Sequence, residues 1–448
     1  MNLKILLIQP PLNPHLIGVG SAYLTEPLAL EIIAASVADH EVRILDMRTG
    51  DTLGAGFSGF CPDVVGITGN TADVYRMLAV LADVKKIDNS ILTVAGGHHA
   101  TMVPQDFNKA AVDVIVIGDG EVTFPELIRV YARKGDFSSV AGIMFRDDNG
   151  VFQATAPRQG CACLDTLPLP MRSLTAGCRN RYFRGSWRPL ASIMTSRGCP
   201  FRCSFCALWK ISGGRYMVRS PESVVGELET IAEDFIDFAE DNALHDVPRA
   251  RKIAELISER GIKKTYKLYA RSDTVVRHPS LIEQWKRVGM ELVLIGMESF
   301  RDSELRGLNK ANNVRNNEEA IRILHRNGVE IAAYFIIQPD YTEQDFDQLA
   351  SYVASMNLTQ PIFTVLTPLP GTDLYEQKFK ELTTHNYELY DFVHPVLPTK
   401  LPLEKFYACL LQLYSACYSR PGSNNPAGSN EIFAKMQSKL MNAHAAGC

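Results

Sequence analysis

Residues 196–206 read Ser-Arg-Gly-Cys-Pro-Phe-Arg-Cys-Ser-Phe-Cys, and they place three thiols at the spacing Cys-x3-Cys-x2-Cys. The apolar run at 191–195 precedes them, so we expect a strand that delivers Cys199, Cys203 and Cys206 on one loop. Three thiolates can bind three corners of a [4Fe-4S] cube, which leaves the fourth iron open to a small molecule. Structural zinc sites need four ligands, and no second Cys or His pair follows at such a spacing. Disulfides are disfavoured because three neighbouring thiols cannot all pair.

This loop, with the aromatic Phe205 before its last cysteine, resembles the cluster-binding loop of the radical SAM superfamily. The resemblance implies that Cys199, Cys203 and Cys206 hold a [4Fe-4S] cluster that cleaves S-adenosylmethionine (SAM). It also implies a partial (β/α)6 barrel. A zinc site at these thiols stays the alternative.

The composition of the 448 residues is that of a globular protein large enough for two or three domains. Hydrophobic residues make up 46% and charged residues 21%, and the net charge of -4 gives no sign of nucleic-acid binding. No apolar run approaches the ~20 residues that a membrane-spanning helix needs, and the N-terminus shows no signal peptide. We therefore expect a cytoplasmic enzyme whose cysteines are ligands or free thiols.

Short apolar runs alternate with helical patterns over the first third of the chain. We expect strands at 3–8, 41–46, 64–68, 91–95 and 112–117, and helices at 27–38 and 71–86. Repeated β-α-β units imply a parallel sheet with helices on both faces, which is a doubly wound, Rossmann-like α/β domain. Such sheets bind ligands at the carboxyl ends of their strands.

Small residues follow several of these predicted strands. They let a large ligand approach the backbone, and the helix N-termini that follow favour anionic groups. The candidate contacts are Thr68, Gly96, Gly97, Gly118, Gly120 and Glu121. Their order and content resemble the cobalamin-binding domain that precedes many radical SAM domains, over residues 1–135. Nucleotide binding is the competing interpretation, but no Gly-x-Gly-x-x-Gly follows the first strand.

The loop after the first predicted strand contains Asn13-Pro14-His15-Leu16-Ile17-Gly18. Cobalamin domains that ligate cobalt through histidine carry Asp-x-His-x-x-Gly there. The resemblance makes His15 a candidate cobalt ligand, with Asn13 orienting it in place of the carboxylate. The alternative is a loop histidine without a role, because an amide does not raise imidazole basicity as a carboxylate does, and Pro14 constrains the loop.

The remaining chain divides into three regions. From 136 to 190 the pattern becomes irregular and proline-containing, which indicates a linker. Strand-like runs at 235–239, 267–271, 291–295, 330–337 and 362–367 alternate with helices and predict a barrel domain at 191–380. Residues 381–448 form a small helical C-terminal region, with an apolar helix at 401–418 and a flexible segment rich in Ser, Asn, Gly and Pro at 419–430.

The predicted strand ends of the barrel carry polar residues at the positions where the superfamily binds SAM. An ammonium group needs acceptors and a carboxylate needs cationic donors, so the residue types suit the two ends of the methionyl group. By resemblance, the candidates are Glu240 and Asp241 for the methionyl amino group, Arg271 and Lys310 for the carboxylate, Gly296 for close approach of the cofactor, and Glu298 or Ser299 for the ribose hydroxyls.

Resemblance to this combined class implies that an electron from the reduced cluster cleaves SAM to a 5′-deoxyadenosyl radical, which abstracts hydrogen from an unactivated carbon. Cobalamin would then supply the methyl group, so methylation of a small molecule or lipid is the leading hypothesis. The motifs at 196–206, 213–216 (Gly-Gly-Arg-Tyr) and 367–372 (Thr-Pro-Leu-Pro-Gly-Thr) look most like the branch with the hopanoid C-3 methylases. A reductant such as flavodoxin or ferredoxin is the implied protein partner.

Two other functions stay open. The enzyme could instead transfer the 3-amino-3-carboxypropyl group of SAM to a soft acceptor such as trivalent arsenic, for which thiolates have affinity. The spare thiols for that reaction are Cys161, Cys163, Cys178, Cys409, Cys417 and Cys448. The chain could also be a non-catalytic iron-sulfur or cobalamin carrier.

Overall fold

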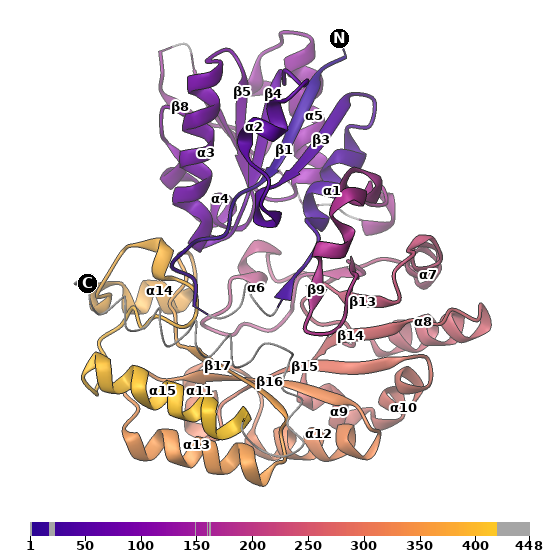
Figure 1. Cartoon of the computed structure of the whole chain (residues 1–448), viewed down its shortest axis with the longest axis vertical. Coiled ribbons are helices and arrows are strands. Elements are labelled where there is room, and N and C mark those ends of the chain that lie inside the picture. Colours follow the sequence, from indigo (N-terminus) through magenta and orange to yellow (C-terminus); the bar gives the residue numbers. More distant parts are fainter. Residues whose placement is uncertain (1, 18–22, 148, 159, 161–162, 419–448) are drawn as a thin grey trace. The chain divides into compact units, whose positions relative to one another are not determined.

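The computed structural model describes residues 2–17, 23–147, 149–158, 160 and 163–418. They form two compact units. The N-terminal unit contains the residues up to Pro14 together with Glu26–Arg179 and Asn386–Glu388. The barrel unit contains His15–Thr25, Asn180–His385 and the residues from Leu389 onward. Each unit is built around its own large sheet (Figure 1).

The N-terminal unit is a doubly wound sheet with the strand order β3-β1-β4-β5-β6-β7-β8. Its parallel strands are β1 (Lys4–Gln9), β3 (Glu41–Asp46), β4 (Val64–Thr68), β5 (Leu92–Gly96) and β6 (Val114–Val116). Its longer helices are α1 (Leu28–Ser36) and α5 (Gly120–Ala132), which share one hydrophobic core, and α3 (Val74–Ile87), which packs in a second. Ile5 and Leu7 of β1 face the first core, whereas Leu6 and Ile8 face the second, so both faces of the sheet are buried. The predicted α/β architecture is confirmed.

The segment that the sequence indicates as a linker, 136–190, is structured over much of its length. Strands β7 (Ile143–Arg146) and β8 (Phe152–Ala154) extend the first sheet in the antiparallel direction. Ile143 and Phe145 point into the core, with half-buried residues between them, but so short an alternation gives a weak sequence signal. Residues 143–154 thus belong to the sheet and not to a linker. The shorter helical elements of this part of the chain are α2 (Leu53–Phe57), α4 (His98–Met102), η2 (Met47–Thr49), η3 (Thr71–Asp73), η4 (Pro104–Phe107), η5 (Phe137–Ser139), η6 (Leu164–Thr166) and η7 (Arg172–Arg181).

The barrel unit contains six parallel strands in the order β10-β13-β14-β15-β16-β17. The strands are β10 (Leu190–Ile193), β13 (Phe235–Phe238), β14 (Thr265–Ala270), β15 (Met290–Glu298), β16 (Glu330–Ile337) and β17 (Gln360–Val365). The helices after these strands are α7 (Pro221–Thr230), α8 (Val247–Glu259), α9 (Ser272–Arg277), α10 (Pro279–Arg287), α11 (Asp302–Gly307), α12 (Val314–Arg326), α13 (Glu343–Ser355) and α14 (Asp373–Lys378), followed by η8 (Phe379–Glu381) and η9 (Tyr387–Leu389). The sheet is a partial (β/α)6 barrel, as the sequence predicts, with β10 and β17 at its two edges.

Capping residues set the starts of several barrel helices. The Ser220 hydroxyl accepts a hydrogen bond from the Ser223 amide at the start of α7, where Pro221 occupies the first turn. At the start of α13, Thr342 and Asp345 form a reciprocal capping box. These caps satisfy amides that have no partner inside their helix, so they fix the residue at which each helix begins.

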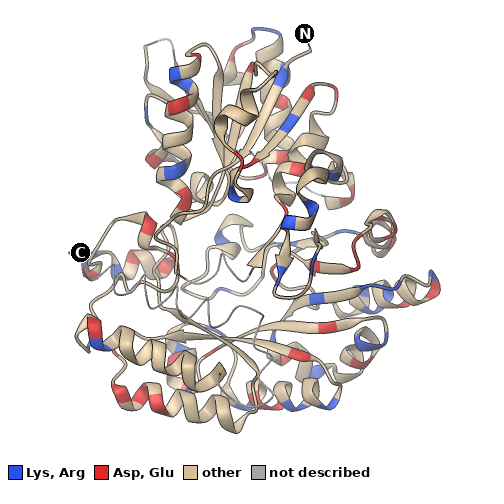
Figure 2. Ribbon diagram, in the orientation of Figure 1, with Lys and Arg blue, Asp and Glu red and all other residues tan. Residues whose placement is uncertain are grey.

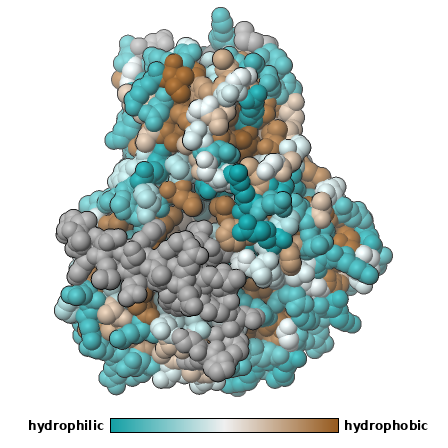
Figure 3. Space-filling view, viewed as in Figure 1, coloured by the Kyte–Doolittle hydropathy of each residue, from teal (hydrophilic) through white to brown (hydrophobic). Residues whose placement is uncertain are grey.

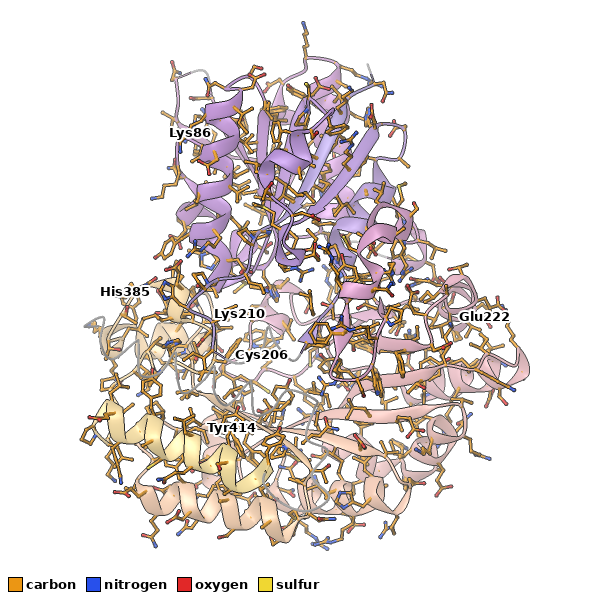
Figure 4. The ribbon with its side chains drawn as sticks, in the orientation of Figure 1. Lys86, Cys206, Lys210, Glu222, His385 and Tyr414 are labelled. Carbon is orange, nitrogen blue, oxygen red and sulfur yellow. The ribbon has the colours of Figure 1, made fainter. Side chains whose placement is uncertain are left out.

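Two segments flank the edges of the barrel sheet. Near β10, the short strands β2 (Tyr23–Leu24) and β9 (Phe183–Arg184) pair antiparallel. Along β17 lies α15 (Leu403–Tyr418), where the Tyr414 ring contacts Phe363 at a centroid distance of 5.0 Å (Figure 4). The Tyr414 hydroxyl also donates to the carbonyl oxygen of Phe363 at 2.7 Å. The apolar helix predicted near the C-terminus therefore packs on the barrel.

The surfaces of both units are mixed in charge. Lys and Arg residues are interspersed with Asp and Glu residues along the ribbons of both units (Figure 2). Hydrophilic side chains predominate on the visible outer helices of the barrel unit (Figure 3). Within the described part of the chain, no helix has the length and hydrophobicity needed to cross a bilayer.

Candidate functional site

The cysteine loop begins at a glycine that cannot be replaced without strain. Strands β11 (Ser196–Arg197) and β12 (Met217–Val218) pair antiparallel and close the base of the loop. Gly198 has φ +85°, and a Cβ placed there would lie 2.2 Å from the carbonyl oxygen of Arg215. Its amide donates to Oδ2 of Asp241 at 2.9 Å. The end of β13 therefore holds the first residue of the loop.

Three further hydrogen bonds fasten the middle of the loop to the barrel. The Ser204 amide donates to the carbonyl oxygen of Leu308 at 3.1 Å, and the Ser204 carbonyl accepts from the Leu374 amide at 2.9 Å. The side-chain amide of Asn309 donates to the carbonyl oxygen of Arg202 at 2.7 Å. Within the loop, the Trp209 indole donates to the carbonyl oxygen of Cys203 at 3.1 Å. The loop is thus held against the barrel by its own hydrogen bonds.

The three thiols of the loop interact electrostatically with one another. Cys206 lies beside α6 (Leu208–Ile211) and interacts with both Cys199 and Cys203 (Figure 4). Burial raises the pKa of all three thiols, that of Cys206 to about 12. At Cys203 burial is the largest effect, and Lys310 and then Arg271 oppose it by lowering the pKa. Buried thiols become ligands when a cation offsets the cost of the thiolate charge, so this donor set fits an iron-sulfur cluster.

No group of three or more His, Cys, Asp or Glu side chains in the described chain is arranged to hold a single metal ion. A cubane cluster does not require such a group, because each cysteine binds a different iron. Outside the loop, Cys409 and Cys417 are buried in α15, Cys163 is exposed, and the Cys178 sulfur lies 3.8 Å from the Thr49 hydroxyl. Cys161 and Cys448 lie outside the described residues.

A buried ion pair lies at the end of β15. The Lys310 ammonium lies 2.6 Å from Oε1 of Glu298, and both side chains are less than one tenth exposed. A Cβ at Gly296 would lie 2.1 Å from this oxygen and 2.9 Å from the Lys310 nitrogen. The space beside Gly296 is therefore filled by the ion pair. Ser299 is also buried, where its hydroxyl donates to Oε2 of Glu304 at 2.5 Å.

Arg271 connects the end of β14 to the cysteine loop. Its guanidinium carbon lies 3.6 Å from the ring centroid of Phe201, which is a loop residue. Its Nη2 donates to the carbonyl oxygens of Lys310 and Ala311 at 3.1 and 3.0 Å, and its Nε donates to Asp273 at 2.9 Å. Nη1 has no hydrogen-bond partner among the described residues and could bind an anion.

The carboxylate of Glu240 accepts hydrogen bonds from residues just before the cysteine loop. Thr195 donates to its two oxygens at 2.7 and 2.9 Å, and Ser196 donates to it as well. Burial raises the pKa of Glu240 and that of Asp241, while the Ser196 hydrogen bond opposes the effect at Glu240. Next to them, the Asn242 side chain is buried and neither of its amide atoms has a hydrogen-bond partner in the described chain. Asn242 directly follows the predicted contacts Glu240 and Asp241 in the segment after β13, and its amide oxygen is an acceptor of the same kind.

The N-terminal unit brings several of its predicted ligand contacts to one edge of the sheet. A Cβ at Gly97, which has φ +98°, would lie 2.4 Å from the Thr68 hydroxyl, so the ends of β4 and β5 touch. The Gly118 amide donates to the Thr101 hydroxyl at 3.0 Å, which links the end of β6 to α4. The residues placed at these strand ends are Thr68, Gly96, Gly97, Gly118, Gly120 and Glu121.

Tyr387 returns to this edge from far along the chain. It contacts His99, whose ring nitrogens pair with Thr71 at 3.2 Å and Asp106 at 3.0 Å. Burial lowers the pKa of His99, while the hydrogen bond and charge of Asp106 oppose the shift. The sequence carried no signal for Tyr387, because its contacts join residues almost three hundred positions apart.

His15 belongs to the barrel unit and is exposed. Asn13 belongs to the N-terminal unit, where its side-chain amide donates to the carbonyl oxygen of Glu388 at 2.8 Å. The same amide donates to the carbonyl oxygen of Ala72 at 3.5 Å. The loop after β1 carries His15 out of the unit that holds the other candidate cobalamin contacts.

Comparisons with known proteins identify both units. A B12 binding domain model matches residues 14–128, and a Radical SAM superfamily model matches residues 193–353. The hopanoid C-3 methylase of Methylococcus capsulatus is 32% identical over 405 residues, which cover 88% of this chain and 77% of that protein. An uncharacterized methyltransferase of Pyrococcus horikoshii is 28% identical, over 94% of this chain and 93% of that protein.

Solved structures share the fold over nearly the whole chain. The cobalamin-dependent S-adenosylmethionine radical enzyme OxsB, with aqua-cobalamin and S-adenosylmethionine bound, matches with a TM-score of 0.72 and 16% identity, over 99% of this chain and 72% of that one. The radical S-adenosylmethionine methyltransferase TsrM from Kitasatospora setae, with cobalamin and a [4Fe-4S] cluster bound, matches with a TM-score of 0.72 and 17% identity, over 98% and 100%.

The chain belongs to the radical SAM enzymes that carry a B12-binding domain, the family of the cobalamin-dependent radical SAM methyltransferases. It is an enzyme, and its cofactors are a [4Fe-4S] cluster, SAM and cobalamin. The predictions of family, enzyme class and cofactors are confirmed.

Proposed function

We propose that this enzyme methylates an unactivated carbon of a small molecule or lipid. The observation that carries the proposal is the fixed loop that presents Cys199, Cys203 and Cys206 beside two cations, Lys310 and Arg271. When bound, the cluster supplies the electron that cleaves SAM, and cobalamin supplies the methyl group. The protein's own part is to hold these groups and the acceptor in register and to exclude water.

We assign the cysteines as the iron ligands and the neighbouring polar groups as contacts of the methionyl end of SAM. Nη1 of Arg271 and the Lys310 ammonium are the donors for its carboxylate. The acceptors for its amino group are Oδ1 of Asp241, which makes no hydrogen bond in the described chain, and the unpartnered Oδ1 of Asn242. Glu240 acts indirectly, because its oxygens already hold the strand before the loop.

Glu298, Gly296 and Ser299 are proposed to support the SAM site without contacting SAM directly. Glu298 is proposed to orient Lys310, and Gly296 leaves room for their pair. Ser299 is proposed to hold the turn after β15 and not the ribose, because its hydroxyl is buried and bonded to Glu304.

Cobalamin is proposed to bind at the carboxyl edge of the first sheet, against the backbone from Thr68 to the turn at Gly118–Glu121. Gly118, whose Cβ position has no neighbour within 4 Å, leaves the backbone open to a large flat ligand, whereas Gly97 lets the ends of β4 and β5 approach each other. His15 is proposed to be a loop histidine without a bond to cobalt, because the amide of Asn13 does not raise imidazole basicity as a carboxylate does, and Pro14 constrains the loop. The electron is proposed to come from a reductant such as flavodoxin or ferredoxin.

The test is anaerobic reconstitution with iron, sulfide and cobalamin, followed by reduction and mass analysis of the products of SAM. 5′-Deoxyadenosine is expected, and the joint replacement of Cys199, Cys203 and Cys206 by Ala should abolish it. Cys61→Ala, which removes an exposed thiol of the N-terminal unit, is the matched control and should keep it. Methylthioadenosine as the main product would favour 3-amino-3-carboxypropyl transfer, and no SAM turnover would contradict both functions.

A further inference from the structure

One layer of the barrel interior is charged. Ser192, Asp237 and Lys267 are register partners on β10, β13 and β14. Their sequence neighbours, such as Ile236 and Leu268, pack in the outer core, so these three side chains face the inside of the barrel. The Lys267 ammonium lies 2.7 Å from Oδ1 of Asp237, and both side chains are fully buried. Such a pair is expensive to desolvate and is weak evidence for a role in stability alone.

Phenols and a second cation join this layer from the edge of the sheet. Lys267 donates to the Tyr269 hydroxyl at 2.8 Å, and the Tyr23 hydroxyl donates to Asp237. Arg184 is the register partner of Tyr23 on the neighbouring strand, and its guanidinium carbon lies 5.7 Å from the Tyr23 ring centroid. The charges of Asp237 and Arg184 both act on Lys267. The layer therefore contains two cations and one carboxylate.

Arg184 is the cation of this layer whose charge is not paired with a carboxylate in the described chain. Within the described chain its side chain has no ion pair and no hydrogen bond, and its guanidinium lies over the Tyr23 ring. It interacts electrostatically with Tyr334, a half-buried residue on β16. The Tyr334 hydroxyl also makes no hydrogen bond with a described residue. A half-buried guanidinium and a nearby phenol that both lack partners are the groups that recognise an anion.

Apolar side chains lie next to these phenols on the neighbouring strands and are partly open to solvent. Leu294 is the register partner of Tyr269, and Ile362 is the register partner of Tyr334. These inward-facing side chains are half-buried, whereas the outward-facing Val293 and Phe363 beside them are fully buried in the core. Solvent therefore reaches the inner side of β14–β17. The cation Arg184 and the apolar side chains of Leu294 and Ile362 both belong to this region.

We propose that this barrel interior binds the methyl acceptor, and that the acceptor is a mostly apolar molecule with a single carboxylate. Arg184 and the Tyr334 hydroxyl bind the carboxylate, while Leu294 and Ile362 contact the apolar body. One net positive charge in the layer matches one negative charge on the ligand. That the bound molecule is the methyl acceptor rests on the proposed function. That the barrel interior binds an apolar carboxylic acid rests only on the residues of the barrel.

The experiment is equilibrium dialysis of the reconstituted full-length enzyme with radiolabelled dodecanoate and, separately, dodecanol. The two probes share one chain and differ in the anionic group. Dodecanoate is expected to bind about tenfold more tightly than dodecanol, because one hydrogen bond to a charged group contributes a factor of about ten to affinity. Arg184→Gln should weaken dodecanoate binding about tenfold and leave dodecanol binding within about twofold.

Two further variants keep the test decisive. Tyr334→Phe removes one hydroxyl and keeps the ring, and it should weaken dodecanoate binding by about threefold or more even if Arg184→Gln folds poorly. Arg287→Gln removes an exposed arginine of α10 and should change neither probe. Equal binding of the two probes, no binding of dodecanoate, or insensitivity to both Arg184 and Tyr334 would overturn the proposal. Failure of the proposed function would instead appear as absent SAM cleavage by the wild-type enzyme in the product assay.

Discussion

Replacing Gly198 by Ala should distort the cysteine loop and lower its capacity for iron. The structure separates the cost into two parts. An alanine at φ +85° pays about 1–2 kcal/mol for the left-handed backbone. Its Cβ would also lie 2.2 Å from the Arg215 carbonyl oxygen and 2.6 Å from Cβ of Ser212, so the loop has to move and the hydrogen bond to Asp241 is lost. A hydrogen bond to a charged group contributes about 1.5–3 kcal/mol, which brings the total to about 2.5–5 kcal/mol.

Gly213→Ala is the matched control for this prediction. Gly213 lies in the same loop with φ +62°, and a Cβ there would meet nothing within 4 Å. It should cost only the backbone part, about 1–2 kcal/mol. Urea unfolding followed by far-UV circular dichroism and iron and sulfide analysis after reconstitution measure the two effects. The reasoning is refuted if both variants lose the same stability and bind the same amount of iron.

Three other predictions concern buried charges and the cobalt site. Lys310→Met should destabilise the barrel unit by about 3–5 kcal/mol, because Glu298 stays buried without its partner. Denaturant unfolding measures this loss of unfolding free energy. The double variant with Glu298→Leu should recover much of the loss. Glu31 is fully buried, and burial together with the neighbouring Glu26 raises its pKa to about 8. The stability that protonated Glu31 contributes is therefore complete below about pH 4.5 and is lost as the pH rises through about 8. Over that pH range the Tm of the wild type should fall relative to the Tm of Glu31→Gln. Parallel curves of Tm against pH for the two proteins would contradict this. His15→Ala should leave the electron paramagnetic resonance spectrum of bound cob(II)alamin unchanged, whereas loss of a nitrogen splitting would identify His15 as a cobalt ligand.

Much of the architecture follows from local sequence patterns. Short apolar runs separated by helical patterns predicted both parallel sheets, because strands buried on both faces read as continuous hydrophobic segments. The Cys-x3-Cys-x2-Cys spacing predicted the loop, and strand ends predicted where polar residues such as Asp241 and Arg271 lie. The two strands β7 and β8 were missed because each is short and only β7 shows a brief alternation.

The contacts that were not predictable join residues far apart in the sequence. Asn13 bonds to Glu388 across 375 positions, and Tyr23 bonds to Asp237 across 214. Such contacts depend on how the units fold and leave no periodic trace in the chain. For the same reason the sequence could not show that the Glu240 oxygens accept hydrogen bonds from Thr195 and Ser196, while Glu240 as a SAM contact stays a prediction.

Electron paramagnetic resonance of the reduced, anaerobically reconstituted enzyme tests the central claim most directly. The account predicts a [4Fe-4S] signal whose shape changes when SAM is added and which is lost in the Cys203→Ala variant. A signal that SAM leaves unchanged, or the binding of zinc at these three cysteines in place of iron, would contradict it.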